Sequence, residues 1–124
     1  MFKFFRIHLK ARDVTSTARW YVEHLGAKQV QDYEDKGNHH ILVDIDGVEV
    51  IITQPPDAAD LPDAPLGPYI GLEHFGVVAD DLGRTLADMQ AKGVEVIWKT
   101  PPESASQFAF VRAPDSVRLE LVQG

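Results

Sequence analysis

The sequence predicts an α+β fold in which a βαβββ unit occurs twice in tandem. The main observation is an internal repeat, in which residues 6–25 align with residues 74–92 and residues 46–54 align with residues 115–123, at an offset of 67 to 69 residues. A repeat of this length indicates two copies of one supersecondary unit. The second observation is that each half begins with alternating apolar and polar residues and then changes to helical spacing.

Each unit is expected to open with a strand that leads into a capped helix. Apolar and polar residues alternate over 7–11 and again over 75–79. Asp13 and Asp81 then stand where an N-cap carboxylate accepts backbone N–H groups. Apolar residues follow at one-face helical spacing, at Val14, Ala18, Tyr21 and Leu25 in the first copy and at Leu82, Leu86 and Met89 in the second.

Three short strands are expected after each helix. Gly26 and Gly93 stand where glycine ends a helix. The Asp46-Gly47 pair favours a hairpin turn, and Pro114-Asp115 is typical of a turn start. The predicted strands cover residues 27–34, 39–45 and 48–54 in the first unit, and residues 94–99, 107–112 and 117–122 in the second.

A proline-rich segment joins the two units. Residues 55–69 hold five of the eight prolines, which is typical of an extended linker. We expect residues 1–124 to form one domain, with unit one at about 1–54 and unit two at about 70–124, because neither half alone has enough chain to bury a stable core.

Composition excludes several classes of protein. The chain has 44% hydrophobic and 25% charged residues, unlike a disordered or fibrous protein. A net charge of −7 without a basic stretch argues against a nucleic-acid partner. No apolar run approaches the roughly 20 residues of a membrane span, and the start lacks a signal-peptide apolar region. The absence of cysteine fits a reducing compartment, so we expect a cytoplasmic protein that binds neither nucleic acid nor membranes.

Local motifs agree with the tandem organisation. Copy one holds Asp13, Trp20-Tyr21 and Leu25-Gly26, copy two holds Glu73-His74-Phe75-Gly76-Val77, and the chain ends in Ala-Pro-Asp-Ser-Val-Arg-Leu-Glu-Leu-Val-Gln. Together with the repeat, these motifs resemble the vicinal oxygen chelate superfamily of glyoxalase I, bleomycin-resistance proteins and extradiol dioxygenases. The resemblance implies a curved mixed sheet that encloses a cavity, and a homodimer.

The resemblance also implies four metal-ligand positions. They are occupied here by Arg6, Ile51, His74 and Glu120. The internal alignment pairs the same positions, Arg6 with His74 and Ile51 with Glu120. Only His74 and Glu120 are ligand-type residues. The alternative is that both are ordinary polar residues on an exposed sheet face.

His8 is the expected third ligand, because it shares a strand face with Arg6 two residues away. With His74 and Glu120 it would form a 2-His-1-carboxylate set that leaves positions open for substrate or water. The implied cofactor is a divalent metal ion, namely Zn, Fe, Mn, Ni or Co. The alternative is a histidine that lines a cavity and binds no metal.

Two carboxylates are candidates for catalytic proton transfer. One is Glu120 itself, and the other is Glu49, which lies two residues before Ile51 on the same face. Glu49 is otherwise an exposed carboxylate without a role.

The same sheet faces are expected to carry many charged and polar groups, namely Arg6, His8, Lys10, Glu49, Thr53, His74, Arg118 and Glu120. A dry core does not tolerate them, so the faces line a polar cavity or are open to water. Arg6 is a candidate clamp for an anionic substrate, Arg112 a rim residue and Trp98 a pocket wall. Solvated basic side chains and plain aromatic packing are the alternatives.

Two functions that involve a small molecule are consistent with these residues, and a third interpretation is a dimerisation module whose cavity binds neither metal nor small molecules. The first is a metalloenzyme that acts on a small, anionic, oxygen-bearing substrate by metal-assisted proton transfer, as an isomerase, lyase or epimerase, or by oxygen chemistry. The second is a metal-free small-molecule binding protein of the bleomycin-resistance type, favoured by Arg6 and Ile51 at ligand positions.

Overall fold

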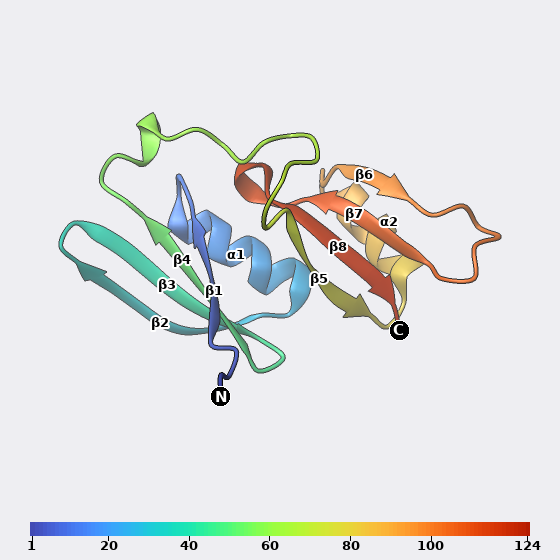
Figure 1. Cartoon of the computed structure of the whole chain (residues 1–124), viewed down its shortest axis with the longest axis horizontal. Helices are drawn as coiled ribbons and strands as arrows, with labels where there is room; N and C mark the ends of the chain where they lie inside the picture. The colour runs from blue at the N-terminus through green and yellow to red at the C-terminus, as the bar shows by residue number, and fades with distance from the viewer. The chain divides into compact units, whose positions relative to one another are not determined.

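The computed structural model describes all residues from 1 to 124, which form two compact units, Met1–Pro62 and Asp63–Gly124 (Figure 1). Each unit consists of one mixed four-stranded sheet and one α-helix against a face of that sheet. The predicted α+β architecture of two βαβββ units is therefore confirmed.

Unit one contains the elements β1 (Arg6–Lys10), α1 (Val14–Leu25), β2 (Lys28–Asp35), β3 (Asn38–Ile45) and β4 (Val48–Gln54). The strands lie in the order β1-β4-β3-β2. The β1 and β4 strands are parallel, because the helix returns the chain across the sheet, whereas the remaining pairs are antiparallel.

Unit two repeats this topology with β5 (His74–Ala79), α2 (Leu82–Ala91), β6 (Val96–Lys99), β7 (Phe108–Arg112) and β8 (Arg118–Gln123). The strand order is β5-β8-β7-β6, with β5 parallel to β8. Arg6 lies opposite Glu49 in the parallel pair of unit one, and His74 lies opposite Arg118 in that of unit two. The registers therefore match the sequence alignment of the two halves.

Aspartates cap both helices, as predicted. The Asp13 side chain accepts a hydrogen bond from the Ser16 backbone N–H at 3.1 Å, and Asp81 accepts one from the Arg84 N–H at 3.0 Å. These bonds satisfy donors that have no partner inside the helix.

A glutamine supplies a second cap in each unit, which the sequence analysis did not predict. Gln54, at the end of β4, accepts a hydrogen bond from the Val14 N–H through Oε1 at 3.0 Å. Gln123, at the end of β8, does the same for the Leu82 N–H at 2.8 Å. The last strand of each unit is thereby tied to the start of its helix.

The core of each unit lies between the helix and the sheet. Buried residues come from the apolar face of each helix and from the strands. In unit two the buried strand positions alternate with less buried ones on β7 and β8. In unit one they are consecutive, at 41–43 on β3 and 50–53 on β4, so both faces of these central strands are covered. The residues exposed by less than 2% include Val14, Tyr21, Ile41, Val43, Val50 and Ile52 in unit one and Met89, Val111, Leu119 and Leu121 in unit two.

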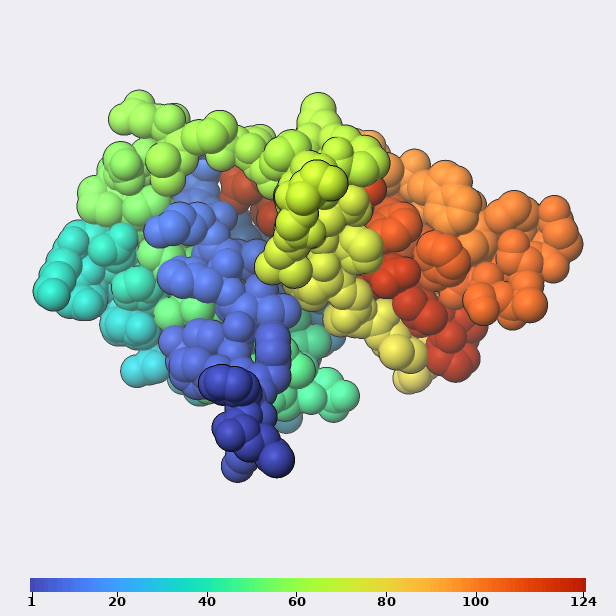
Figure 2. Space-filling view, viewed as in Figure 1, coloured from blue at the N-terminus to red at the C-terminus, as the bar shows by residue number.

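The segment between the units differs from a fully extended linker. It contains a single 3-10 turn over Ala58–Asp60, and the Arg12 guanidinium donates a hydrogen bond to the Ala58 carbonyl at 2.8 Å. At the other end of unit one, the first five residues project from its surface and expose the rings of Phe2, Phe4 and Phe5 (Figure 2). Neither helix is long and apolar enough to cross a membrane.

Candidate functional site

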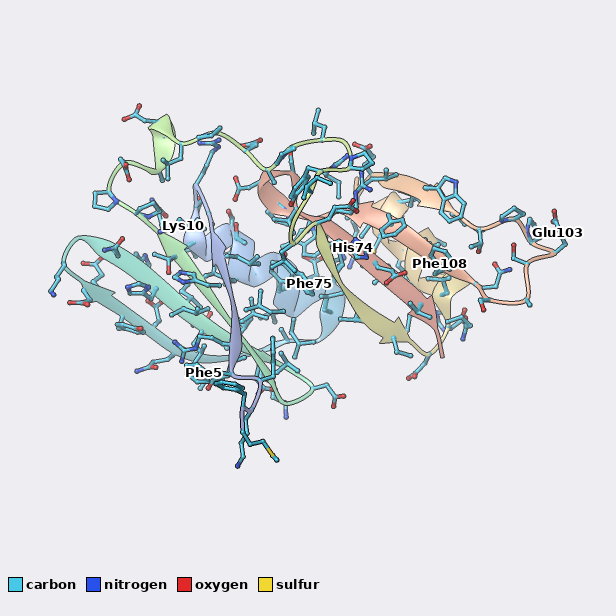
Figure 3. The ribbon with its side chains drawn as sticks, viewed as in Figure 1. Phe5, Lys10, His74, Phe75, Glu103 and Phe108 are labelled. Carbon is cyan, nitrogen blue, oxygen red and sulfur yellow. The ribbon has the colours of Figure 1, made fainter.

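Unit two brings together two of the three residues predicted as metal ligands, His74 and Glu120. His74 begins β5 and Glu120 lies in the middle of β8, on the polar face of the sheet. His74 Nε2 is 3.8 Å from Glu120 Oε1, and the side chains are 31% and 27% exposed. Figure 3 shows where His74 lies in this unit. An imidazole nitrogen and a carboxylate oxygen therefore face each other at a partly open surface.

Glu73 holds the other nitrogen of the His74 ring. Glu73 Oε1 lies 3.1 Å from His74 Nδ1, and the same oxygen accepts a hydrogen bond from Arg118 Nη1 at 3.2 Å. Arg118 is itself fixed, because its Nη2 donates to the Leu66 carbonyl at 3.2 Å. Consecutive residues of a strand point to opposite faces, which would keep the Glu73 and His74 side chains apart. Glu73 precedes β5, which begins at His74, so its side chain is free of this alternation and reaches the imidazole.

The Phe110 ring forms a wall beside the imidazole. Its centroid is 4.9 Å from that of His74 in an edge-to-face arrangement, at an interplanar angle of 78°. The Arg118 guanidinium carbon lies 5.6 Å from the same phenyl centroid. Phe110 therefore restricts the orientation of the His74 ring from β7.

Gly76 leaves space for the Glu120 side chain. The two residues are directly opposite in the β5–β8 pair. A Cβ atom built at Gly76 would lie 3.0 Å from Glu120 Oε1 and 3.2 Å from Glu120 Cβ, which is closer than ordinary van der Waals contact. An alanine at this position would require the Glu120 side chain to shift by a few tenths of an ångström, so glycine accommodates the close approach of the carboxylate.

Unit one has no ligand-type residue at the equivalent positions. Arg6, the counterpart of His74, donates to Glu49 Oε2 from Nη2 at 3.0 Å and from Nε at 3.3 Å. Ile51, the counterpart of Glu120, is 5% exposed. Two residues predicted to act on substrate, Arg6 and Glu49, are thus paired with each other.

His8 lies on the polar face of unit one, in a small hydrogen-bonded cluster. Its Nε2 is 2.8 Å from the Thr53 hydroxyl oxygen, and His40 Nδ1 lies 2.7 Å from the same atom. The hydroxyl has one hydrogen and donates to at most one ring, so at least one of the two imidazoles donates to the Thr53 oxygen. Tyr33 stacks on His40 at a centroid distance of 4.8 Å.

The sequence analysis missed this cluster, although a signal was present. A two-residue turn at Asp46-Gly47 fixes the hairpin register and places His40 opposite Thr53. The neighbouring His39 points to the other face, where its Nε2 is 2.6 Å from Asp32 Oδ1.

The environment of His8 favours its neutral form. Partial burial lowers the pKa of the imidazole below its ordinary value, and the positive charge of Lys10 lowers this pKa further. His40 and Arg6 act in the same direction with smaller effects. A neutral imidazole is able to bind a metal or accept a proton near pH 7.

The two remaining predicted substrate residues, Arg112 and Trp98, lie on the sheet of unit two. Arg112 Nη1 donates to the Ser116 carbonyl at 3.3 Å and Nη2 to the Leu66 carbonyl at 3.5 Å, so this guanidinium supports the turn before β8. Trp98 is 48% exposed, and its ring centroid is 5.4 Å from that of Phe108. Both roles in substrate binding stay predictions.

The donor set of unit two fits part of a metal site. His74 and Glu120 are common metal-ligand types, and Glu73 supplies the outer hydrogen bond that metal-binding histidines usually make. Within neither unit do three His, Cys, Asp or Glu side chains gather at a spacing that could hold an ion. The role of His8 as third ligand therefore stays a prediction.

The chain contains two βαβββ units, and in each of them the first and last strands of the unit pair in parallel. Residues 3–121 match the model of the Glyoxalase/Bleomycin resistance protein/Dioxygenase superfamily. The chain belongs to this superfamily, as the resemblance noted in the sequence implied. No curated protein sequence matches the chain at a significant level.

Solved structures give the same result for the fold. The glyoxalase family protein from Enterococcus faecalis is 20% identical, with a TM-score of 0.78, and the match covers 97% of this chain and 96% of that one. A glyoxalase I mutant from Zea mays is 20% identical, with a TM-score of 0.81 over 98% of this chain and 44% of that one.

A third structure contains a metal. It is a mutant of the fosfomycin resistance protein FosX from Listeria monocytogenes, in complex with Mn(II) and 1S,2S-dihydroxypropylphosphonic acid. It is 16% identical, with a TM-score of 0.78, and the match covers 100% of this chain and 94% of that one. Similarity at this level of identity establishes a common fold.

Proposed function

We propose that the protein is a metal-dependent enzyme of the glyoxalase/dioxygenase type that acts on a small, anionic, oxygen-bearing substrate. The observation that carries this proposal is the facing pair in unit two, where His74 Nε2 and Glu120 Oε1 are 3.8 Å apart on an accessible sheet face. The metal-containing FosX structure supports it, because the folds are similar.

His74 and Glu120 would hold the divalent ion, with His8 of unit one as the predicted third ligand. When bound, such an ion supplies Lewis-acid polarisation of a substrate oxygen. Its identity, among Zn, Fe, Mn, Ni and Co, determines whether proton transfer or oxygen chemistry follows. The ring of Phe110 and the Glu73 carboxylate keep the His74 imidazole in one orientation.

Other side chains of the chain would bind the substrate and move its proton. Arg6 is the proposed partner of an anionic group, and a substrate carboxylate would compete with Glu49 for its guanidinium. Glu120 is the first candidate for proton transfer. Glu49 is the second, because Arg6 already occupies one of its oxygens. Trp98 and Arg112 complete the proposed substrate-binding set.

One observation favours the second candidate function, a metal-free small-molecule binding protein. The unit-one counterparts of His74 and Glu120 are a guanidinium engaged with Glu49 and the buried side chain of Ile51. A protein of this kind would hold its ligand by charge and by aromatic contacts alone.

Metal content decides between the two functions. Untagged protein is reconstituted with each candidate ion, freed of excess metal and measured by elemental mass spectrometry. The wild type should retain about one ion per chain, and His74→Ala, Glu120→Ala and His8→Ala should each lose it. The matched control is His39→Ala, because His39 faces Asp32 on the opposite side of its strand.

Far-UV circular dichroism checks that each variant is folded. Retained metal in His74→Ala would remove this residue from the ligand set, and retained metal in His8→Ala would leave a site built on unit two alone. A wild type that retains no ion would favour the metal-free binding protein.

A further inference from the structure

Glu73 forms the only hydrogen bond with the His74 ring in unit two. Its Oε1 lies 3.1 Å from Nδ1, whereas Nε2 is 3.8 Å from Glu120 Oε1, which is too long for a hydrogen bond. The two ring nitrogens therefore have different environments, one in contact with an acceptor and one open.

The chemistry of Glu73 determines where the imidazole hydrogen lies. An ionised carboxylate only accepts hydrogen bonds, so the short contact requires a hydrogen on His74 Nδ1. A neutral imidazole has a single N–H, which leaves a lone pair on Nε2. Arg118 donates to the same Glu73 oxygen and is anchored on the Leu66 carbonyl, so the acceptor has a fixed position.

Unit one provides an internal comparison. The residues equivalent to Glu73 and His74 are Phe5 and Arg6, and there the guanidinium carbon lies 4.0 Å from the centroid of the phenyl ring. The preceding residue thus contacts its neighbour in both units, but it is a hydrogen-bond acceptor only in unit two, where that neighbour is a histidine and not an arginine.

We propose that Glu73 is a positioning residue that fixes His74 in the tautomer with hydrogen on Nδ1, so that Nε2 presents its lone pair beside Glu120. The assignment of Nε2 as a metal-binding atom rests on the proposed function, but the tautomer itself does not. The Glu73 carboxylate acts through His74 and does not itself contact the ion.

The tautomer is measured on metal-free protein by two-bond ¹H–¹⁵N correlation spectra, at a pH where the histidines are neutral. The wild-type spectrum should show hydrogen on Nδ1 of His74. In Glu73→Ala the Nε2–H form should appear, whereas Glu73→Gln should keep the Nδ1–H form because its amide oxygen is still an acceptor. Glu103→Ala is the control, since Glu103 lies far from His74 in the loop between β6 and β7 (Figure 3).

Cobalt titration of the same proteins tests the consequence. Loss of an outer-shell partner typically weakens metal binding about 10–100-fold, which is the expected change for Glu73→Ala, with recovery in Glu73→Gln. Hydrogen on Nε2 in the wild type would overturn the proposal even if no variant folds. So would an unchanged tautomer or an unchanged cobalt affinity in Glu73→Ala. A wild type that shows the Nδ1–H form but retains none of the five candidate ions would support the positioning role and contradict the proposed metalloenzyme.

Discussion

At the scale of single residues, the two units differ at one pair of equivalent positions that lie opposite each other in the parallel strands. The pair Gly76 and Glu120 in unit two corresponds to His8 and Ile51 in unit one. The absence of a side chain at Gly76 gives the Glu120 carboxylate room above the strand. In unit one the strand position carries an imidazole, and its partner is a buried aliphatic side chain. Only unit two therefore combines a glycine with a ligand-type carboxylate on the opposite strand, at Gly76 and Glu120.

Gly76→Ala should weaken metal binding without unfolding the protein. The added methyl group would meet the Glu120 side chain at 3.0 to 3.2 Å and force it to move, so cobalt affinity should fall at least about tenfold. The free energy of unfolding should stay the same or rise, since alanine restricts the unfolded chain more than glycine does.

Cobalt titration and urea unfolding measure the two effects separately. Val78→Ala is the control, because Val78 is the next residue on the same strand face and is 69% exposed. An unchanged affinity in Gly76→Ala would show that Glu120 tolerates the methyl group or does not bind the metal.

At the scale of elements, each helix is held by two caps of different origin. The aspartate cap is local, because Asp13 and Asp81 precede their helices directly. The glutamine cap is long-range, because Gln54 and Gln123 reach the helix from the end of the last strand. The buried position of Val14 keeps water from replacing the glutamine as a partner.

Gln54→Met should destabilise the protein by about 1–2 kcal/mol, because it leaves the buried N–H of Val14 without an acceptor. Gln123→Met should have a similar effect through Leu82. Urea unfolding monitored by circular dichroism gives both values, with Gln31→Met on the exposed strand β2 as the control. Equal urea midpoints for Gln54→Met and Gln31→Met would show that the long-range cap does not stabilise the protein.

At the scale of the whole molecule, the tandem repeat raises the question of whether the units unfold together. We propose that residues 1–124 form one cooperative domain, because a unit of about 62 residues buries a small share of its surface and has only marginal stability by itself. The homodimer implied by the family resemblance is an untested prediction at the same scale.

The two tryptophans report on different units, Trp20 from α1 and Trp98 from β6. Trp20→Phe and Trp98→Phe each leave one fluorescent reporter. Within each variant, the urea transition measured by fluorescence should coincide with the transition measured by circular dichroism, as expected for two-state unfolding. The comparison is made within a variant because the two substitutions shift the midpoint by different amounts. A fluorescence transition that separates from the circular dichroism transition in either variant would indicate two independently unfolding units.

The sequence by itself determined the order of the elements, the aspartate caps and the repeat-equivalent positions of His74 and Glu120. These features follow from local periodicity, from residues that end helices or form turns, and from the registers that short turns impose. The predicted strand bounds accordingly lie within two residues of those in the structure.

Only the tertiary structure decided which side chains meet. The approach of Glu73 to His74, the pairing of Arg6 with Glu49 and the convergence of His8 and His40 on Thr53 depend on rotamers and on contacts between strands distant in sequence. Alternation assigns a residue to a face of a sheet, but it does not specify which neighbour the side chain turns toward. The physical reason is that a hydrogen bond requires a particular distance and orientation, which chain spacing alone does not set.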